Sequence, residues 1–99
     1  MEGQARISAD VLARYAADAA CEVPGVLGLV EGRLHRHRGV RVLGGAGRPT
    51  LEGHLRLERG ASIPAVGREV QRRVAEYLRR MADVEPEAVD VVVDDIGRA

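Results

Sequence analysis

A strict alternation of side chains over residues 50–58 constrains the fold of this chain more than any other feature. Successive side chains of a β-strand point to opposite faces of the sheet, so the alternation divides the segment into two sets. The apolar or small set is Leu51, Gly53, Leu55 and Leu57, and the polar set is Glu52, His54, Arg56 and Glu58. One dry face and one wet face predict an antiparallel or mixed sheet that helices cover on one side only.

Two segments have the three- and four-residue spacing of amphipathic helices. We expect the first helix to begin at Ser8, a good N-cap, and to stop at Pro24-Gly25. We expect the second to begin at Ser62, with Pro64 tolerated in its first turn. The apolar stripe of the first helix is Ile7, Val11, Leu12, Tyr15, Ala16, Ala19, Ala20 and Val23, and that of the second is Ile63, Val66, Val70, Val74, Tyr77, Leu78 and Met81.

Three further segments, residues 26–30, 39–43 and 88–96, are typical of strands, and residues 44–49 are typical of a turn. We therefore predict an α+β fold, a two-layer sandwich of order α-β-β-β-α-β. In it, two helices pack on one face of a three- or four-stranded sheet. A chain of 99 residues fits one domain, which we assign to residues 1–99.

The core of this fold must be built from small aliphatic side chains, because the sequence has no Phe, no Trp and only two Tyr residues. Small side chains each bury little area, and burial contributes only about 25 cal/mol per Å². A domain with such a core is often stabilised further by oligomerisation. Cys21 is the only cysteine, so no intramolecular disulfide forms, and its small apolar neighbours predict a buried, inert thiol.

The charges of the chain cancel overall but are divided along it. Residues 31–80 hold twelve arginines against five acids, whereas residues 81–99 hold six acids against one arginine. Two charged sets are therefore candidate partner-binding surfaces. They are Arg68, Arg72, Arg73, Arg79 and Arg80 on the second helix, and Asp90, Asp94 and Asp95 on the last strand. Guanidinium groups suit carboxylate and phosphate partners; the simpler alternative is a solvated helix face in an arginine-rich proteome.

No group of residues in the sequence predicts catalysis, a cofactor or a metal. His35-Arg36-His37 and His54 offer three imidazoles to zinc, but the neighbouring arginines repel a divalent cation. Asp90 and Asp94 lie about 13 Å apart along a regular strand, which is too far for one small ion. Gly44–Gly47 lacks the lysine of a phosphate-binding loop and precedes a strand. We expect a protein that is not an enzyme and that needs no cofactor.

Membrane insertion is not expected from the sequence. No segment approaches the roughly 20 apolar residues of a membrane span. No apolar stretch follows Met1–Ile7, so no signal peptide is expected either. Any association with a membrane would therefore come through a partner.

Several segments, in this order, resemble the alkaline shock protein family of bacterial envelope-stress proteins. The matching residues are Ile7-Ser8, Val11-Leu12, Glu22-Val23-Pro24-Gly25-Val26, Gly28, Gly60-Ala61-Ser62-Ile63, Val70-Gln71, Val74, Met81 and Val89–Ile96. The resemblance implies a non-enzymatic cytoplasmic stress-response protein that self-associates as a homo-oligomer. It also implies docking on a membrane-anchored relative at the inner face of the membrane. It supplies no catalytic residues.

The order of elements also resembles KH-type RNA-binding domains, so RNA binding is the alternative function. Those domains clamp RNA with a Gly-x-x-Gly loop between two helices. Gly44–Gly47 has this spacing but lies between expected strands, and the expected strands have no aromatic side chains on which bases would stack. A nucleic-acid partner is therefore less favoured than a protein partner.

Overall fold

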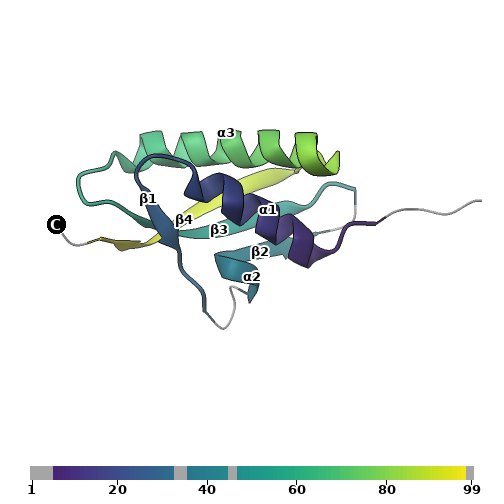
Figure 1. The fold of residues 1–99 in the computed structure, drawn as a ribbon, viewed down its shortest axis with the longest axis horizontal. Coiled ribbons are helices and arrows are strands. Elements are labelled where there is room, and N and C mark those ends of the chain that lie inside the picture. Colours follow the sequence, from purple (N-terminus) through teal and green to yellow (C-terminus); the bar gives the residue numbers. More distant parts are fainter. Residues whose placement is uncertain (1–5, 33–35, 45–46, 98–99) are drawn as a thin grey trace, which may run out of the picture.

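The computed structural model describes residues 6–32, 36–44 and 47–97. The helices are α1 (Ala9–Cys21), α2 (Arg36–Gly39) and α3 (Ile63–Ala82), and the strands are β1 (Val26–Leu29), β2 (Val40–Leu43), β3 (Thr50–Leu57) and β4 (Ala88–Ile96). The two long helices, α1 and α3, lie together on one face of the sheet (Figure 1). The predicted α+β two-layer sandwich and its order are confirmed, with the single-turn helix α2 as an addition.

β3 is the central strand of a mixed, four-stranded sheet. β4 runs parallel to β3 along one edge, from Ala88 opposite Thr50 to Ile96 opposite Leu57. β1 and β2 run antiparallel to β3 and share its other edge, where β1 pairs with residues 55–57 and β2 with residues 50–53. α3 forms the crossover that joins the parallel pair, as parallel strands require.

Both long helices begin at the serine caps that the sequence predicts. The Ser8 hydroxyl accepts a hydrogen bond from the Val11 N–H, and the Ser62 hydroxyl accepts one from the Ala65 N–H, both at 3.3 Å. α3 ends at Asp83, whose backbone is left-handed (φ 53°) and whose N–H donates to the Arg79 carbonyl. The limits of both helices are thus set by short-range hydrogen bonds.

Replacing the cap of α3 tests this assignment. Ser62→Ala should lower the free energy of unfolding by about 1 kcal/mol, because the helix loses an acceptor for one of its unpaired N–H groups. Urea denaturation followed by circular dichroism measures the loss. Ser62→Asp is the matched control, since it retains an acceptor and places a negative charge at the positive end of the helix. An equal loss in both variants would contradict the capping role.

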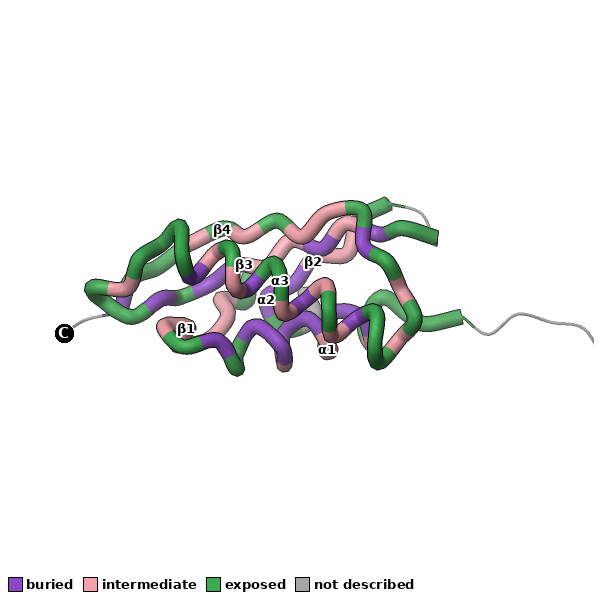
Figure 2. Tube along the Cα trace, turned by 90° about the horizontal axis from the view of Figure 1, so that it is seen from above, coloured by how far each residue is buried: buried purple, intermediate pink, exposed green. Residues whose placement is uncertain are grey.

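The core fills the space between the two long helices and the inner face of the sheet (Figure 2). α1 contributes alanines, whose small size lets the helix approach the sheet closely. β3 and α3 contribute larger aliphatic side chains. The fully or nearly fully buried set includes Ala13, Ala16, Ala17, Ala19, Ala20, Leu51, Leu55, Leu57, Val70, Val74 and Leu78. Tyr15 of α1 and Tyr77 of α3 pack against this core and meet edge to face, with ring centroids 5.6 Å apart.

Some predictions of side-chain exposure are wrong. Ile7, Ile63 and Met81, at the ends of the predicted apolar stripes, are exposed. His54 belongs to the polar set of β3, yet only 6% of the residue is exposed, because carboxylates from two strands close around its ring. Cys21 is exposed rather than buried, because it lies beside the core stripe at the last position of α1. Partial burial still raises the pKa of the Cys21 thiol, against the opposing effect of Arg38, so the thiol form is favoured.

Candidate functional site

The arginines predicted as a basic surface lie on the exposed side of α3, but most of them are engaged by acids. The Arg72 guanidinium donates to Glu69 at 2.6 Å and to Glu76 at 2.9 Å. Arg73 donates to Glu69 at 3.0 Å. These partners lie three or four residues apart, so one helix face supplies both signs of charge.

The remaining arginines of α3 are held differently from one another. Arg79 donates to Glu85 at 3.0 Å, which ties the end of α3 to the segment before β4. Arg80 lies over the ring of Tyr77, 5.5 Å from its centroid, in a cation–π contact. Arg68 is exposed and forms no ion pair with the residues that the structure describes. Arg68 and Arg80 are therefore the arginines of this set that have no carboxylate partner within the described chain.

The pairing on α3 shifts the ionisation of its acids. Hydrogen bonds from Arg72 first, and from Arg73 second, lower the pKa of Glu69 to about 2. A hydrogen bond from Arg79 lowers the pKa of Glu85 in the same way. A carboxylate with a lowered pKa supports the fold fully above its ordinary pKa and loses this effect progressively as the pH falls from there through the lowered value. The contribution of the Glu69 pairs is therefore lost between the ordinary pKa of glutamate and about 2.

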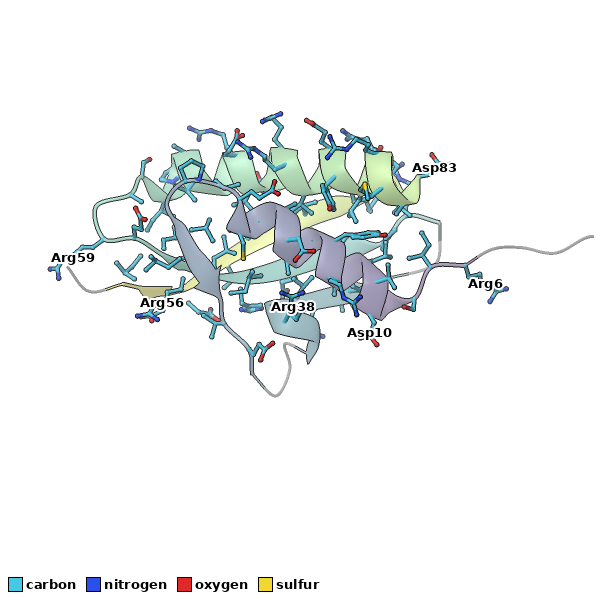
Figure 3. All side chains as sticks on the ribbon, viewed as in Figure 1. Arg6, Asp10, Arg38, Arg56, Arg59 and Asp83 are labelled. Carbon is cyan, nitrogen blue, oxygen red and sulfur yellow. The ribbon has the colours of Figure 1, made fainter. Side chains whose placement is uncertain are left out.

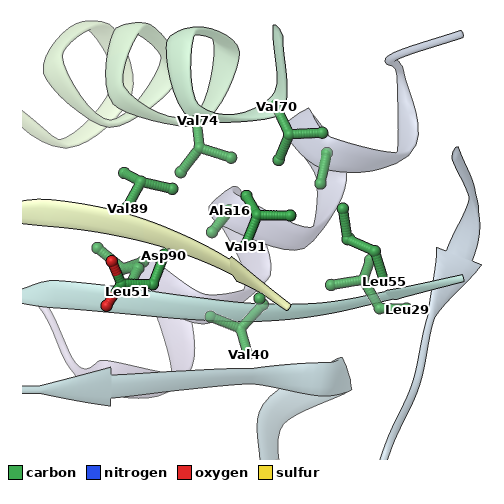
Figure 4. Close-up of a pocket in the computed structure, with 12 residues that line it drawn as sticks. Ala16, Leu29, Val40, Leu51, Leu55, Val70, Val74, Val89, Asp90 and Val91 are labelled. Atoms are coloured by element: carbon green, nitrogen blue, oxygen red, sulfur yellow. The ribbon is translucent and has the colours of Figure 1, made fainter. Parts of the chain in front are cut away.

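A depression of about 250 Å³ lies between α1 and α3, beside these pairs. Its lining carries both signs of charge: Ala19, Glu22, Arg72, Arg73, Glu76, Tyr77 and Arg80. A second space, between α3 and the sheet, is apolar and measures only about 10 Å³ (Figure 4). Ligand pockets usually measure about 300–1,000 Å³, so the inner space does not hold a small-molecule ligand.

The acids of β4, predicted as the second surface, are placed individually rather than as a cluster. Asp94 meets His54, and Asp95 meets the Nε of Arg56 at 3.1 Å. Asp90 is exposed and pairs in register with Glu52, which places both on the side of the sheet away from the helices. Figure 3 shows Arg56 on this same side. We call this side the outer sheet face; its charged residues are Arg41, Glu52, His54, Arg56, Asp90, Asp94 and Asp95.

The most closely connected group on the outer sheet face is centred on His54. Its Nδ1 lies 2.8 Å from an oxygen of Asp94 on β4, and its Nε2 lies 2.8 Å from an oxygen of Glu52 on β3. Arg41 on β2 extends the group, with a guanidinium nitrogen 3.9 Å from Glu52. A row of contacts between basic and acidic side chains therefore crosses β2, β3 and β4.

This histidine group is not arranged as a metal site. The two carboxylates lie against opposite nitrogens of the ring, so they cannot converge with it on one ion. No group of three or more His, Cys, Asp or Glu residues in the described ranges could hold a metal. The zinc set considered from the sequence also needs the side chains of His35 and His37, which lie outside the described residues. The sequence signal for the observed group is the two-residue spacing of Glu52 and His54, which places both on one face of β3.

The two candidate surfaces lie on opposite faces of the sandwich. The α3 surface, defined as Arg68, Arg72, Arg73, Arg79, Arg80, Glu69 and Glu76, faces away from the sheet. The outer sheet face is turned the other way, and no helix in the described residues packs against it (Figures 1 and 3). A single copy therefore cannot bring the two surfaces into contact.

A family model matches residues 1–98, which is nearly the whole chain, and its family is described as having a cell envelope-related function. The match decides the family. The chain belongs to the alkaline shock protein 23 family. The resemblance seen in the sequence is thus confirmed for this alkaline shock family protein, and with it a cell envelope-related function. No helix in the described part of the chain is long and apolar enough to cross a membrane.

Solved structures share the fold of this alkaline shock family protein. The copper form of the MamM CTD matches with a TM-score of 0.66 at 17% identity, over 88% of this chain and 85% of that chain. The cadmium form of a MamM CTD variant matches with a TM-score of 0.64 at 18% identity, over 86% of this chain and 94% of that chain. At such low identity the likeness concerns the fold alone. A search of curated proteins finds no match.

Proposed function

We propose that this alkaline shock family protein acts without catalysis, in the envelope stress response, by binding copies of itself and a protein partner near the cell membrane. The observation that carries the proposal is the placement of opposite charge on opposite faces. The α3 surface has five arginines against two glutamates, and Glu85 neutralises Arg79 from the segment before β4, which leaves a balance of two positive charges. The outer sheet face has two arginines against four carboxylates, a balance of two negative charges when His54 is neutral.

Opposite faces with complementary charge favour head-to-tail association. The α3 surface of one copy meets the outer sheet face of the next, and each added copy exposes a fresh surface of each kind. A heterologous contact of this type closes into a ring or continues as a filament. The core supports the same view, because a core without Phe or Trp gives a small domain that gains stability from association.

Docking near the membrane is the second half of the proposal. The family description is envelope-related, and the described helices include none that could span a bilayer. A membrane-anchored relative at the cytoplasmic side is therefore the partner we propose, bound through one of the two charged surfaces. A pull-down from the native host, probed for a small membrane protein, tests this half. Recovery of soluble proteins alone would contradict it.

Charge reversal on the α3 surface tests self-association. Light scattering or sedimentation of the wild type should show mass rising with concentration and falling with salt, because salt screens the attraction between the two faces. The double variant Arg68→Glu, Arg80→Glu should weaken association about tenfold, since each position contributes attraction in the wild type and repulsion in the variant. These two positions leave the Arg72, Arg73 and Arg79 pairs intact.

Arg14→Glu on α1 is the matched control for each single substitution, because it makes the same charge change outside the α3 surface. It should associate more tightly than either Arg68→Glu or Arg80→Glu alone. A wild-type protein that stays monomeric at high concentration and low salt contradicts self-association. Equal weakening by Arg14→Glu would instead show that net charge matters and that the α3 surface does not.

RNA binding remains the alternative that an experiment should separate from protein binding. Arg72, Arg73 and Arg79 hold carboxylates within the chain, and these would compete with phosphate. Binding to phosphate must weaken steeply as salt rises. An RNA pool retained at low salt and released on salt addition would favour the RNA-binding alternative over the proposed function.

A further inference from the structure

The outer sheet face contains a buried histidine, His54, to which the proposed function assigns no role. The side chain of His54 is only 8% exposed, whereas those of its partners Glu52 and Asp94 are 22% and 31% exposed. Both ring nitrogens lie at hydrogen-bond distance from carboxylate oxygens. The ring is therefore clamped between β3 and β4 on the face that we propose for association.

The number of protons on the ring decides how many of these contacts are hydrogen bonds. An ionised carboxylate only accepts hydrogen bonds, and a neutral imidazole donates from one nitrogen only. The doubly protonated imidazolium is the form that donates to both Glu52 and Asp94. When the proton leaves, one nitrogen presents a lone pair to a carboxylate, and that contact becomes repulsive.

We propose that the proton on His54 regulates association through the outer sheet face, in the direction that loss of the proton strengthens it. Loss of the proton makes the face more negative by one charge. It also removes the hydrogen bond from the ring to one carboxylate, Glu52 or Asp94, so that this carboxylate accepts from an arginine on the α3 surface of the next copy. The inference rests on the proposed head-to-tail association and specifies its regulation.

The charges around His54 support this direction. On β3 the ring faces Glu52, and Arg56 lies two residues further along the strand. On β4 the ring faces Asp94, with Asp90 and Asp95 on either side of it. On β2 Arg41 reaches Glu52. Arginine stays charged throughout the physiological range, and exposed carboxylates are ordinarily ionised above about pH 5. Between about pH 5 and pH 8, an imidazole is the side chain that ordinarily changes charge.

The test compares the concentration dependence of association at several pH values in the wild type, His54→Gln and Asp94→Asn. The wild type should associate about fivefold more tightly at pH 8 than at pH 5, the size expected for one surface charge pair. His54→Gln should lose this dependence because glutamine does not gain a proton. In Asp94→Asn the amide donates to Nδ1 while a neutral ring donates to Glu52, so the dependence should shrink.

The comparison also contains its own control. Wild type and His54→Gln both contain His35 and His37, so any effect of those residues is common to the two proteins. A pH dependence that survives in His54→Gln, or weaker wild-type association as the pH rises, overturns the inference and leaves head-to-tail association standing. Absence of association at every pH overturns both. Circular dichroism checks that each variant is folded, and if His54→Gln is not, Asp94→Asn decides alone.

Discussion

Leu55→Ala should lower the free energy of unfolding by about 3 kcal/mol, the middle of the range for deleting a buried leucine. Leu55 lies on the central strand, and none of its surface is exposed. It lines the inner space where α1 and α3 meet the sheet (Figure 4). The surrounding side chains are mainly alanines, valines and leucines held between the helix layer and the sheet, so they cannot move far enough to fill the cavity. The free energy of unfolding of a small domain is roughly 5–15 kcal/mol in total, so the loss is a large fraction of its stability.

Leu27→Ala is the matched control for this prediction. It removes the same atoms from β1, where Leu27 is 51% exposed, and should cost under about 1 kcal/mol. Urea denaturation of both variants gives the two free energies. Similar losses would contradict the placement of the core, since burial is the difference between the two leucines. Association should be checked in parallel, because binding between copies raises apparent stability with concentration.

Periodicity was sufficient to predict the two layers because each long element satisfies a local rule. The alternation from Leu51 to Leu57 sets the dry face of β3, and the stripe from Val66 to Leu78 sets the buried side of α3. Both correspond to buried residues in the structure. The serine caps fixed the helix starts for the same reason, since a cap needs only atoms three residues away.

The features that were not predicted depend on contacts between distant segments. Alternation assigns every polar residue of β3 to solvent, and it places His54 on the correct face. Its burial requires Asp94, forty residues further along, to reach its ring. That contact depends on the parallel register of β3 and β4 and on the irregularity between Leu55 and Arg56. The periodicity of one strand specifies neither the register nor the irregularity.

The candidate surfaces were likewise predictable in part: their position follows from local spacing, whereas their ion pairs do not. The sequence places the arginines of α3 on one exposed side, and the structure agrees. The ion pairs of these arginines with Glu69, Glu76 and Glu85 depend on the side-chain rotamers. The spacing along the chain allows these rotamers but does not determine which one is adopted. The net charge of a surface is therefore predictable from sequence, whereas the number of arginines left for a partner is not.

Gly39→Ala should be among the most destabilising single-methyl additions in this chain, at about 3 kcal/mol. Gly39 ends α2 at φ 87°, a left-handed conformation that disfavours any side chain. A Cβ there would lie 2.7 Å from the Cβ of Leu29 and 3.0 Å from the carbonyl oxygen of Val30. Both neighbours belong to or adjoin the backbone of β1, so relieving the contact means shifting β1 away from the start of β2.

Gly60→Ala separates the strain of the left-handed backbone from the steric contact of the added Cβ. Gly60 has nearly the same φ, 89°, but a Cβ there would meet nothing within 4 Å. Its substitution should therefore cost only the strain of the left-handed backbone, about 1 kcal/mol. The excess loss in Gly39→Ala measures the close approach of β1 and β2, which share one edge of β3. If the two variants unfold at the same urea concentration, the strands are not held in contact there, and the edge of the sheet is looser than this geometry requires.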